Sequence, residues 1–187
     1  MQKYHQHFSE IDNIYWTNYF LNEFIPKYKF DEKISGTIYI EYHKKDFNDE
    51  PGILELSNLL SSKLGFPPIE YFLIFKHIRA DQLIHVDGIE IPRNASFNLP
   101  LIGYEGTTMC FYEENILHTP SVSNARYYPK ENLTLVETFA GGNEWVLVDT
   151  SVPHNIINVD PGQPRLTLCV RFHSNPTFNN LMKNAKS

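Results

Sequence analysis

The spacing of apolar and polar residues changes along the chain and predicts helices near its two ends. Residues 11–24 (IDNIYWTNYFLNEF) repeat apolar side chains every three or four positions, which predicts a helix that ends before Pro26. Residues 52–66 have the same amphipathic spacing, and Gly65 predicts the end of that helix. The tail at 176–187 fits either a short helix or a frayed end.

Between these segments, short apolar runs rich in β-branched and aromatic residues predict strands. One run precedes the second helix, at 36–43, and turn-forming clusters such as IGYEG and FAGGN separate the others. The later runs lie at 70–79, 82–86, 95–104, 107–113, 133–139, 144–149 and 165–173. A helical start followed by about seven short strands predicts a mainly β fold, a β-sandwich or barrel with flanking helices.

Composition narrows the functional classes. The chain has 187 residues, 42% of them apolar and 14% aromatic, and no repeat or linker indicates a second domain, so we expect a single domain over 1–187. A net charge of −6 argues against general electrostatic binding to nucleic acid or to an anionic membrane. The start of the chain has no apolar signal region, and two cysteines are too few for a disulfide framework. We therefore expect a cytoplasmic protein.

Three residues form a candidate metal site. His85 and Asp87 stand two positions apart at the end of a predicted strand, so they share one face. His154 follows the turn introduced by Pro153. A buried carboxylate needs a partner or a metal, and two imidazoles with one carboxylate can hold Fe(II) while leaving positions open. The alternative is that Asp87 and Gly88 form a simple turn and that His154 is a surface histidine.

The predicted strand after His154 carries groups that suit a carboxylate ligand. Arg165 and Thr167 share a face, and a guanidinium with a nearby hydroxyl can bind a carboxylate through several hydrogen bonds. Arg171 lies on the same face and competes for this role, but the position next to the turn favours Arg165. Asn98 either donates to the metal-binding end of a ligand or satisfies a neighbouring backbone group.

These motifs (HVD, PHNIIN, and an arginine on the next strand followed by x-Thr) resemble the Fe(II)/2-oxoglutarate-dependent oxygenase superfamily. The resemblance covers about residues 68–174, and SFNLPL and HNIIN are similar to its prolyl and aspartyl/asparaginyl hydroxylase branches. It implies a double-stranded β-helix, or jelly roll, with flanking N-terminal helices. The jelly-roll core would occupy about 67–174 and the helical part about 1–66.

The resemblance also implies a set of roles. His85, Asp87 and His154 would be the iron ligands and the catalytic centre, and Arg165 and Thr167 would bind the 5-carboxylate of 2-oxoglutarate. With O2, such an enzyme converts 2-oxoglutarate to succinate and CO2 while it hydroxylates a peptide side chain or a small metabolite. Nucleic acid and membranes are not expected partners.

Two other functions remain open at this stage. One is a cupin-like metal-binding protein or enzyme that does not use 2-oxoglutarate, and Arg165 and Thr167 argue against it. The other is a non-catalytic jelly-roll binding module, which the intact set of three ligands argues against. The polar-aromatic segment 117–133 has the length of a substrate-covering loop, but it also fits an ordinary surface loop.

Overall fold

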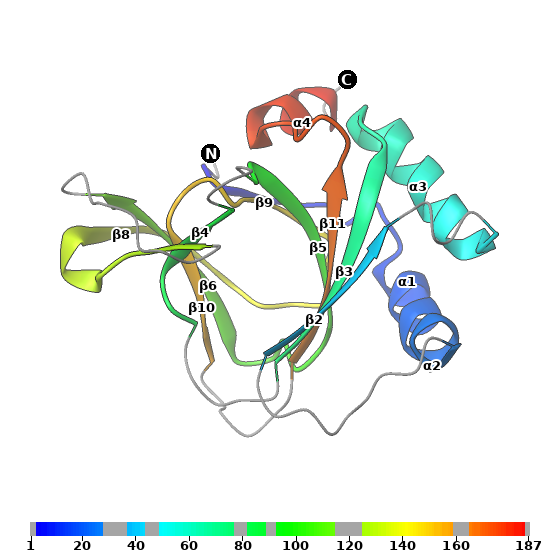
Figure 1. Cartoon of the computed structure of the whole chain (residues 1–187), viewed down its shortest axis with the longest axis horizontal. Helices are drawn as coiled ribbons and strands as arrows, with labels where there is room; N and C mark the ends of the chain where they lie inside the picture. Colours follow the sequence, from blue (N-terminus) through cyan, green and yellow to red (C-terminus); the bar gives the residue numbers. More distant parts are fainter. Residues whose placement is uncertain are drawn as a thin grey trace.

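Two antiparallel sheets face each other, and helices cover the outer side of one of them (Figure 1). The computed structural model describes residues 3–27, 37–43, 49–76, 82–88, 93–114, 125–158 and 165–185; within these, 37–43, 72–76, 125–126 and 158 are described by their backbone alone. The mainly β architecture with flanking helices is confirmed.

The larger sheet has the strand order β1-β9-β5-β11-β3-β2 and the smaller sheet the order β7-β4-β10-β6-β8. In chain order the strands are β1 (His5–His7), β2 (Thr37–His43), β3 (Pro68–Lys76), β4 (His85–Asp87), β5 (Ala95–Ile102), β6 (Thr107–Glu114), β7 (Ala125–Tyr127), β8 (Leu133–Ala140), β9 (Val146–Asp149), β10 (His154–Asn158) and β11 (Arg165–Phe172).

The pairing of these strands defines the topology. β3 pairs with β11, β4 with β10, β5 with β9 and β6 with β8, and every pair is antiparallel. The pairs are nested, and the two sheets take alternate pairs, as when one long hairpin is wound around a barrel. This is the double-stranded β-helix, or jelly roll. β1 and β2 extend the larger sheet at its two edges, and β7 extends the smaller sheet.

The first helical region runs further than the sequence predicts. It consists of α1 (Asn13–Tyr19), the π-helical segment η1 (Phe20–Phe24) and α2 (Ile25–Lys27), so the predicted end before Pro26 is wrong. Proline normally clashes with the carbonyl one α-helical turn earlier. Here the turn before it is wider, because the Ile25 N–H bonds to the carbonyl of Phe20. The wider turn lets the helix continue through the proline.

The other helices follow their sequence signals more closely. α3 (Pro51–Leu64) ends at Gly65, which has a φ of 72° and donates its N–H to the Ser61 carbonyl. The left-handed conformation favours glycine at this position. The tail forms α4 (Phe178–Ala185). Among the described residues, no helix combines the length and the apolar character that crossing a membrane would require.

The region before residue 67, expected to be mainly helical, also contributes strands. β2 is the predicted strand at 36–43, but β1 was not predicted. β1 contains only His5, Gln6 and His7, so it has no apolar alternation to reveal it. It becomes a strand because it pairs with β9 in the larger sheet.

Alternate residues of β11 face two different environments. The even-numbered residues belong to the main hydrophobic core on the outer face of the larger sheet, where the helices pack. These residues are Leu166, Leu168, Val170 and Phe172. The odd-numbered residues therefore face the space between the two sheets. A second apolar cluster lies in that space, where Phe111 of the smaller sheet packs with Val146 and Val148 of the larger one.

Candidate metal centre

Two neighbouring strands of the smaller sheet bring the three predicted ligands together. β4 and β10 run antiparallel, and their register sets His154 directly beside His85. Asp87 lies two positions further along β4, on the same face. One potential ligand atom from each of the three residues lies within 4.8 Å of the other two, and the two imidazole centroids are 4.6 Å apart.

Backbone carbonyls fix the orientation of both imidazoles. The Nδ1–H of His85 donates to the Leu83 carbonyl at 2.8 Å, and the Nδ1–H of His154 donates to the Val152 carbonyl, also at 2.8 Å. With the proton on Nδ1, each Nε2 keeps a lone pair. The His85 Nε2 lies 3.5 Å from an oxygen of Asp87. Such carbonyl contacts hold metal-binding histidines in one tautomer and one orientation.

The protonation states of the cluster also suit metal binding. Burial lowers the pKa of His154 to about 4, and the nearby His85 lowers it further, against the opposing effect of Asp87. Burial alone would raise the pKa of Asp87, but its contact with His85 and the electrostatic effects of His154 and Arg171 outweigh it, so this pKa lies well below its usual range. At neutral pH the site therefore contains a carboxylate beside a neutral His154, the forms that bind metal.

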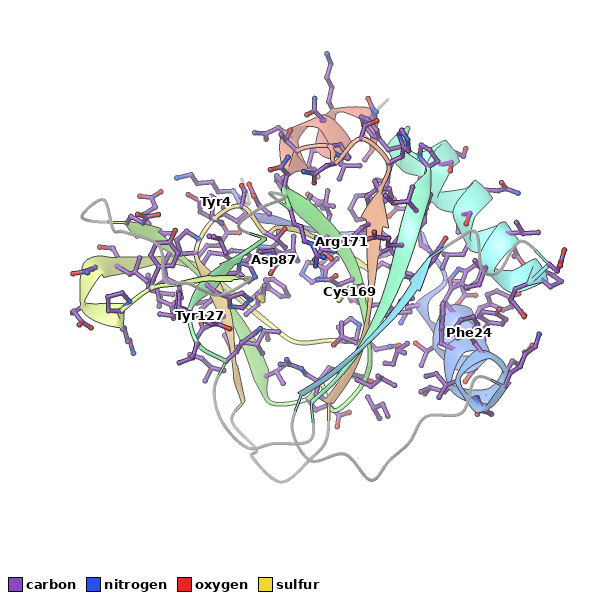
Figure 2. All side chains as sticks on the ribbon, viewed as in Figure 1. Tyr4, Phe24, Asp87, Tyr127, Cys169 and Arg171 are labelled. Carbon is purple, nitrogen blue, oxygen red and sulfur yellow. The ribbon has the colours of Figure 1, made fainter. Side chains whose placement is uncertain are left out.

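An arginine from the opposite sheet holds the carboxylate. The Nη2 of Arg171 donates to Asp87 Oδ2 at 3.0 Å. Figure 2 shows Asp87, Arg171 and Cys169 directed toward one another in the space between the sheets. The sequence indicated Arg171 only as a competitor for ligand binding. Its contact with Asp87 could not be read from spacing along β11, because it crosses from one sheet to the other.

Arg165 and Thr167 lie on the same interior face of β11 as Arg171, and Arg165 stands six positions before it on the strand. Arg165 is buried. Burial raises the pKa of the Cys169 thiol to about 12, and the charges of both Arg171 and Arg165 oppose the increase. The interior face of β11 thus carries two positive charges, those of Arg165 and Arg171, at opposite ends of the strand.

Asn98 also faces this interior. It lies directly opposite Cys169 where β5 pairs with β11. Its amide oxygen accepts a hydrogen bond from the Ser96 hydroxyl at 2.6 Å. This contact uses the amide oxygen, so the NH2 group of Asn98 is the end that could donate, either to a ligand or to a neighbouring backbone group.

Two residues near the cluster were not identified from the sequence. The Gln82 side-chain nitrogen lies 3.3 Å from His85 Nε2, so an ion bound there would displace this amide. Tyr127 pairs with His85 between β7 and β4, and their ring centroids are 6.1 Å apart. Tyr127 belongs to the segment 117–133 that was considered as a substrate cover. Residues 115–124 lie outside the described part of the chain.

Comparison with known proteins gives structural neighbours and no sequence relatives. No family model matches the chain, and no curated protein matches it significantly. The epimerase SnoN, in complex with Fe3+, alpha ketoglutarate and nogalamycin RO, is 15% identical over 84% of this chain and 71% of its own, with a TM-score of 0.49. A Pseudomonas putida prolyl-4-hydroxylase is 18% identical over 77% of this chain and 75% of its own, with a TM-score of 0.40.

A third neighbour is a mutant of Bacillus subtilis oxalate decarboxylase. It is 12% identical over 80% of this chain, with a TM-score of 0.41, and the match spans 29% of the length of the decarboxylase. The jelly-roll assignment rests on the nested strand pairs of this chain and not on these neighbours.

The donor set of the cluster fits a divalent metal. Two imidazole nitrogens and one carboxylate oxygen are the ligands of mononuclear iron sites that keep open coordination positions, and zinc or manganese accept similar donors. Each ligand also has an outer partner: a carbonyl for His85, a carbonyl for His154 and a guanidinium for Asp87. The arrangement can therefore hold an ion at the inner wall of the barrel and leave part of it accessible.

Proposed function

We propose that this protein is a non-haem Fe(II)- and 2-oxoglutarate-dependent oxygenase that hydroxylates a peptide side chain or a small metabolite. The observation that carries the proposal is the convergence of His85, Asp87 and His154, with both Nδ1–H groups already bound to carbonyls. Iron in such a site would supply the activation of O2. The protein's own part is to fix the ligands and to shape a cavity shielded from water.

Arg171 is a positioning residue in this proposal. By donating to Asp87 Oδ2, it keeps the carboxylate ionised and leaves Oδ1, the oxygen nearer His85, for the metal. The carbonyls of Leu83 and Val152 do the same for the two imidazoles. None of these three groups needs to touch the substrate. Their effect is to make the ligand atoms converge before the metal arrives.

Arg165 and Thr167 would bind the 5-carboxylate of 2-oxoglutarate. A chelating 2-oxo acid must extend away from the metal, and the interior face of β11 offers a second guanidinium deeper in the barrel. Arg171 is less suited to this role because it already donates to Asp87. Asn98 would donate its NH2 to the metal-binding end of the cosubstrate. These assignments rest on the family resemblance and on the shared face of the residues.

The proposal is tested by 2-oxoglutarate turnover. The purified protein is supplied with Fe(II), O2 and 2-oxoglutarate, and it should release succinate and CO2, the products that the resemblance implies. We expect Arg165→Gln to weaken 2-oxoglutarate binding by about 10-fold or more, because a charge-assisted bidentate contact is lost. Iron binding should be retained. Thr167→Val should have a smaller effect in the same direction.

The matched control is Lys183→Gln, which removes a positive charge from the last turn of α4, a helix outside the two sheets (Figure 1). Its turnover should equal that of the wild type. Iron binding without any 2-oxoglutarate consumption or binding would contradict the proposal and favour a cupin-like metal protein. Absence of iron binding would contradict both.

A further inference from the structure

A second histidine cluster lies where the edges of the two sheets meet. β1 forms one edge of the larger sheet and β8 one edge of the smaller sheet. The His5 ring stacks on Phe139 of β8 with centroids 4.3 Å apart, and the Lys3 backbone N–H donates to Glu137 at 2.9 Å. An open pocket of about 550 Å³ lies here, lined by His5, His7 and residues 136–140. We call this place the edge pocket.

The edge pocket contains two imidazole–carboxylate pairs. His5 Nδ1 lies 2.5 Å from Glu137 Oε1, and His7 Nδ1 lies 2.9 Å from Glu144 Oε2. His5 and His7 stand two positions apart on β1, so their rings share one face, with centroids 5.3 Å apart. The His5 and Glu137 side chains are largely enclosed, whereas His7 and Glu144 lie nearer the surface.

The two atoms of each pair are at contact distance, but three of these atoms lack the geometry of a hydrogen bond. His5 Nδ1, His7 Nδ1 and Glu137 Oε1 are buried atoms that have no properly directed hydrogen bond among the described residues. Leaving one such group unsatisfied costs about 1–3 kcal/mol, and native proteins rarely do so. Three in a single pocket indicate a missing ligand that accepts electron pairs from nitrogen and oxygen at once.

A metal ion meets this requirement better than a proton. A proton on each imidazole can join that imidazole to its own carboxylate, but the two pairs then stay separate. An ion with several coordination positions can use both nitrogens and the carboxylate oxygen together. Burial also lowers the pKa of His5, against the opposing effect of Glu137, so its nitrogen keeps a lone pair at neutral pH. In a tetrahedral site with bonds of ~2.1 Å the ligand atoms lie ~3.4 Å apart. His5 and Glu137 would need to separate by less than ~1 Å from their present contact.

We propose that the edge pocket is a second, structural metal site that binds a divalent ion of the zinc type through His5, His7 and Glu137, with Glu144 completing the coordination. His5 and Glu137 form the fixed half of the site. His7 and Glu144, which are more exposed, close on the ion. The site is distinct from the one formed by His85, Asp87 and His154, and it does not depend on the function proposed for that cluster.

The bound ion would join β1 to β8 and so close the jelly roll at the edge where the two sheets meet. β1 has three residues, and among the described strands its pairing partner is β9. Phe111 is a neighbour of both clusters. Its ring centroid is 6.1 Å from that of His5 and 6.4 Å from that of His154. An ion in the edge pocket would therefore stabilise the packing of Phe111, which is next to His154 of the first cluster.

The experiment uses the untagged full chain with His85→Ala and His154→Ala, so that the first cluster no longer contributes. Zinc is titrated in competition with a chromophoric chelator, and the melting temperature is measured with and without zinc. We expect one zinc equivalent and a melting temperature that rises with zinc. Adding His7→Asn should weaken zinc binding at least 10-fold, and adding His173→Asn, which changes an exposed histidine outside both clusters, should not.

Glu137→Gln separates metal binding from simple packing. The amide keeps the shape of the carboxylate and can donate to His5 Nδ1, so zinc binding should fall while the metal-free protein keeps or gains thermal stability. Absence of zinc binding in the variant with His85→Ala and His154→Ala would overturn the proposal. Zinc binding that His7→Asn leaves unchanged would also overturn it, because it would indicate an adventitious ion only. If the variant with His85→Ala and His154→Ala does not fold, zinc stoichiometry is measured in chains that keep the first cluster. We expect two zinc equivalents in the wild type and one in His7→Asn, and equal zinc stoichiometry in the two would overturn the proposal.

Discussion

The two faces of β11 differ in what they contribute. On the outer face, Leu168 and Val170 are fully buried against the helices, in an environment made almost entirely of apolar side chains. On the inner face, Arg171 carries charge into the space between the sheets (Figure 2), and Arg165 lies on the same face of the strand. A single strand thus separates the stabilisation of the fold from the chemistry. Substitutions on the outer face should change stability, and substitutions on the inner face should change ligand binding.

The largest effect should come from the outer face. Leu168→Ala removes a fully buried side chain from the main core, and such changes cost about 2–5 kcal/mol. We expect a matching decrease in the free energy of unfolding in urea, with iron stoichiometry unchanged in the folded protein. Leu135→Ala is the control, because Leu135 is 53% exposed and should change stability little. Loss of iron binding by folded Leu168→Ala would contradict the separation of the two faces.

The interior of the barrel should make metal-free stability depend on pH. The pKa of His154 is about 4 in the folded protein and 6.5 ordinarily, so between these values the unfolded chain binds the proton more readily. Stability is therefore present above pH 6.5 and lost as the pH falls toward 4, by about 3 kcal/mol. The lowered pKa of Asp87 adds little in this window, because its contribution changes only below the ordinary value of 3.8.

Urea denaturation of the metal-free protein at several pH values measures this dependence. His154→Gln removes the titrating group, and its stability should change much less between pH 6.5 and 4. His5, whose pKa is also lowered, contributes in the same direction and would remain in that variant. An equally steep dependence in wild type and His154→Gln would show that His154 is not the group responsible.

Removing the positioning arginine should weaken metal binding without unfolding the protein. Arg171→Gln takes away the guanidinium that holds Asp87 Oδ2, and such outer partners are worth about 10- to 100-fold in metal affinity. Arg165→Gln, on the same face but further from Asp87, should leave iron affinity within a few-fold of wild type. Competition with an iron chelator under anaerobic conditions measures both. Equal losses in the two variants would contradict the division of roles between these arginines.

The smallest effect should follow the removal of a polar group from the outer core. The Tyr71 hydroxyl lies 2.6 Å from the Ser57 hydroxyl, and burial raises the pKa of Tyr71 to about 12. Tyr71→Phe should cost only about 1 kcal/mol, because Ser57 still bonds to the Ile53 carbonyl at 2.7 Å. Thermal unfolding checks this value. A loss larger than that of Leu168→Ala would show that the outer face depends on this polar contact and not on apolar packing.

The sequence predicted the features that depend on local periodicity. The alternation within β11, the amphipathic α3 with its end at Gly65, and the shared face of His85 and Asp87 all follow from the spacing of side chains. The proximity of His154 to His85 required one further step, the resemblance to a known arrangement of strands, and the pairing of β4 with β10 agrees with it.

The features that were missed depend on contacts between distant segments. β1 has no apolar pattern of its own and exists through its pairing with β9. The contact between Arg171 and Asp87 crosses the two sheets, and the pair of His5 and Glu137 joins two sheet edges. The continuation through Pro26 depends on a π-helical turn that residue propensity does not predict. In each case the partner could not be identified from one segment alone.

The most direct test of the central claim is an anaerobic titration of Fe(II) and 2-oxoglutarate into the metal-free protein, followed by visible absorption. In the family it resembles, chelation of the metal by the 2-oxo acid produces a charge-transfer band. We predict that the band appears in the wild type, is absent in His154→Ala, and needs more 2-oxoglutarate in Arg165→Gln. Iron binding without a band at any 2-oxoglutarate concentration would contradict the account.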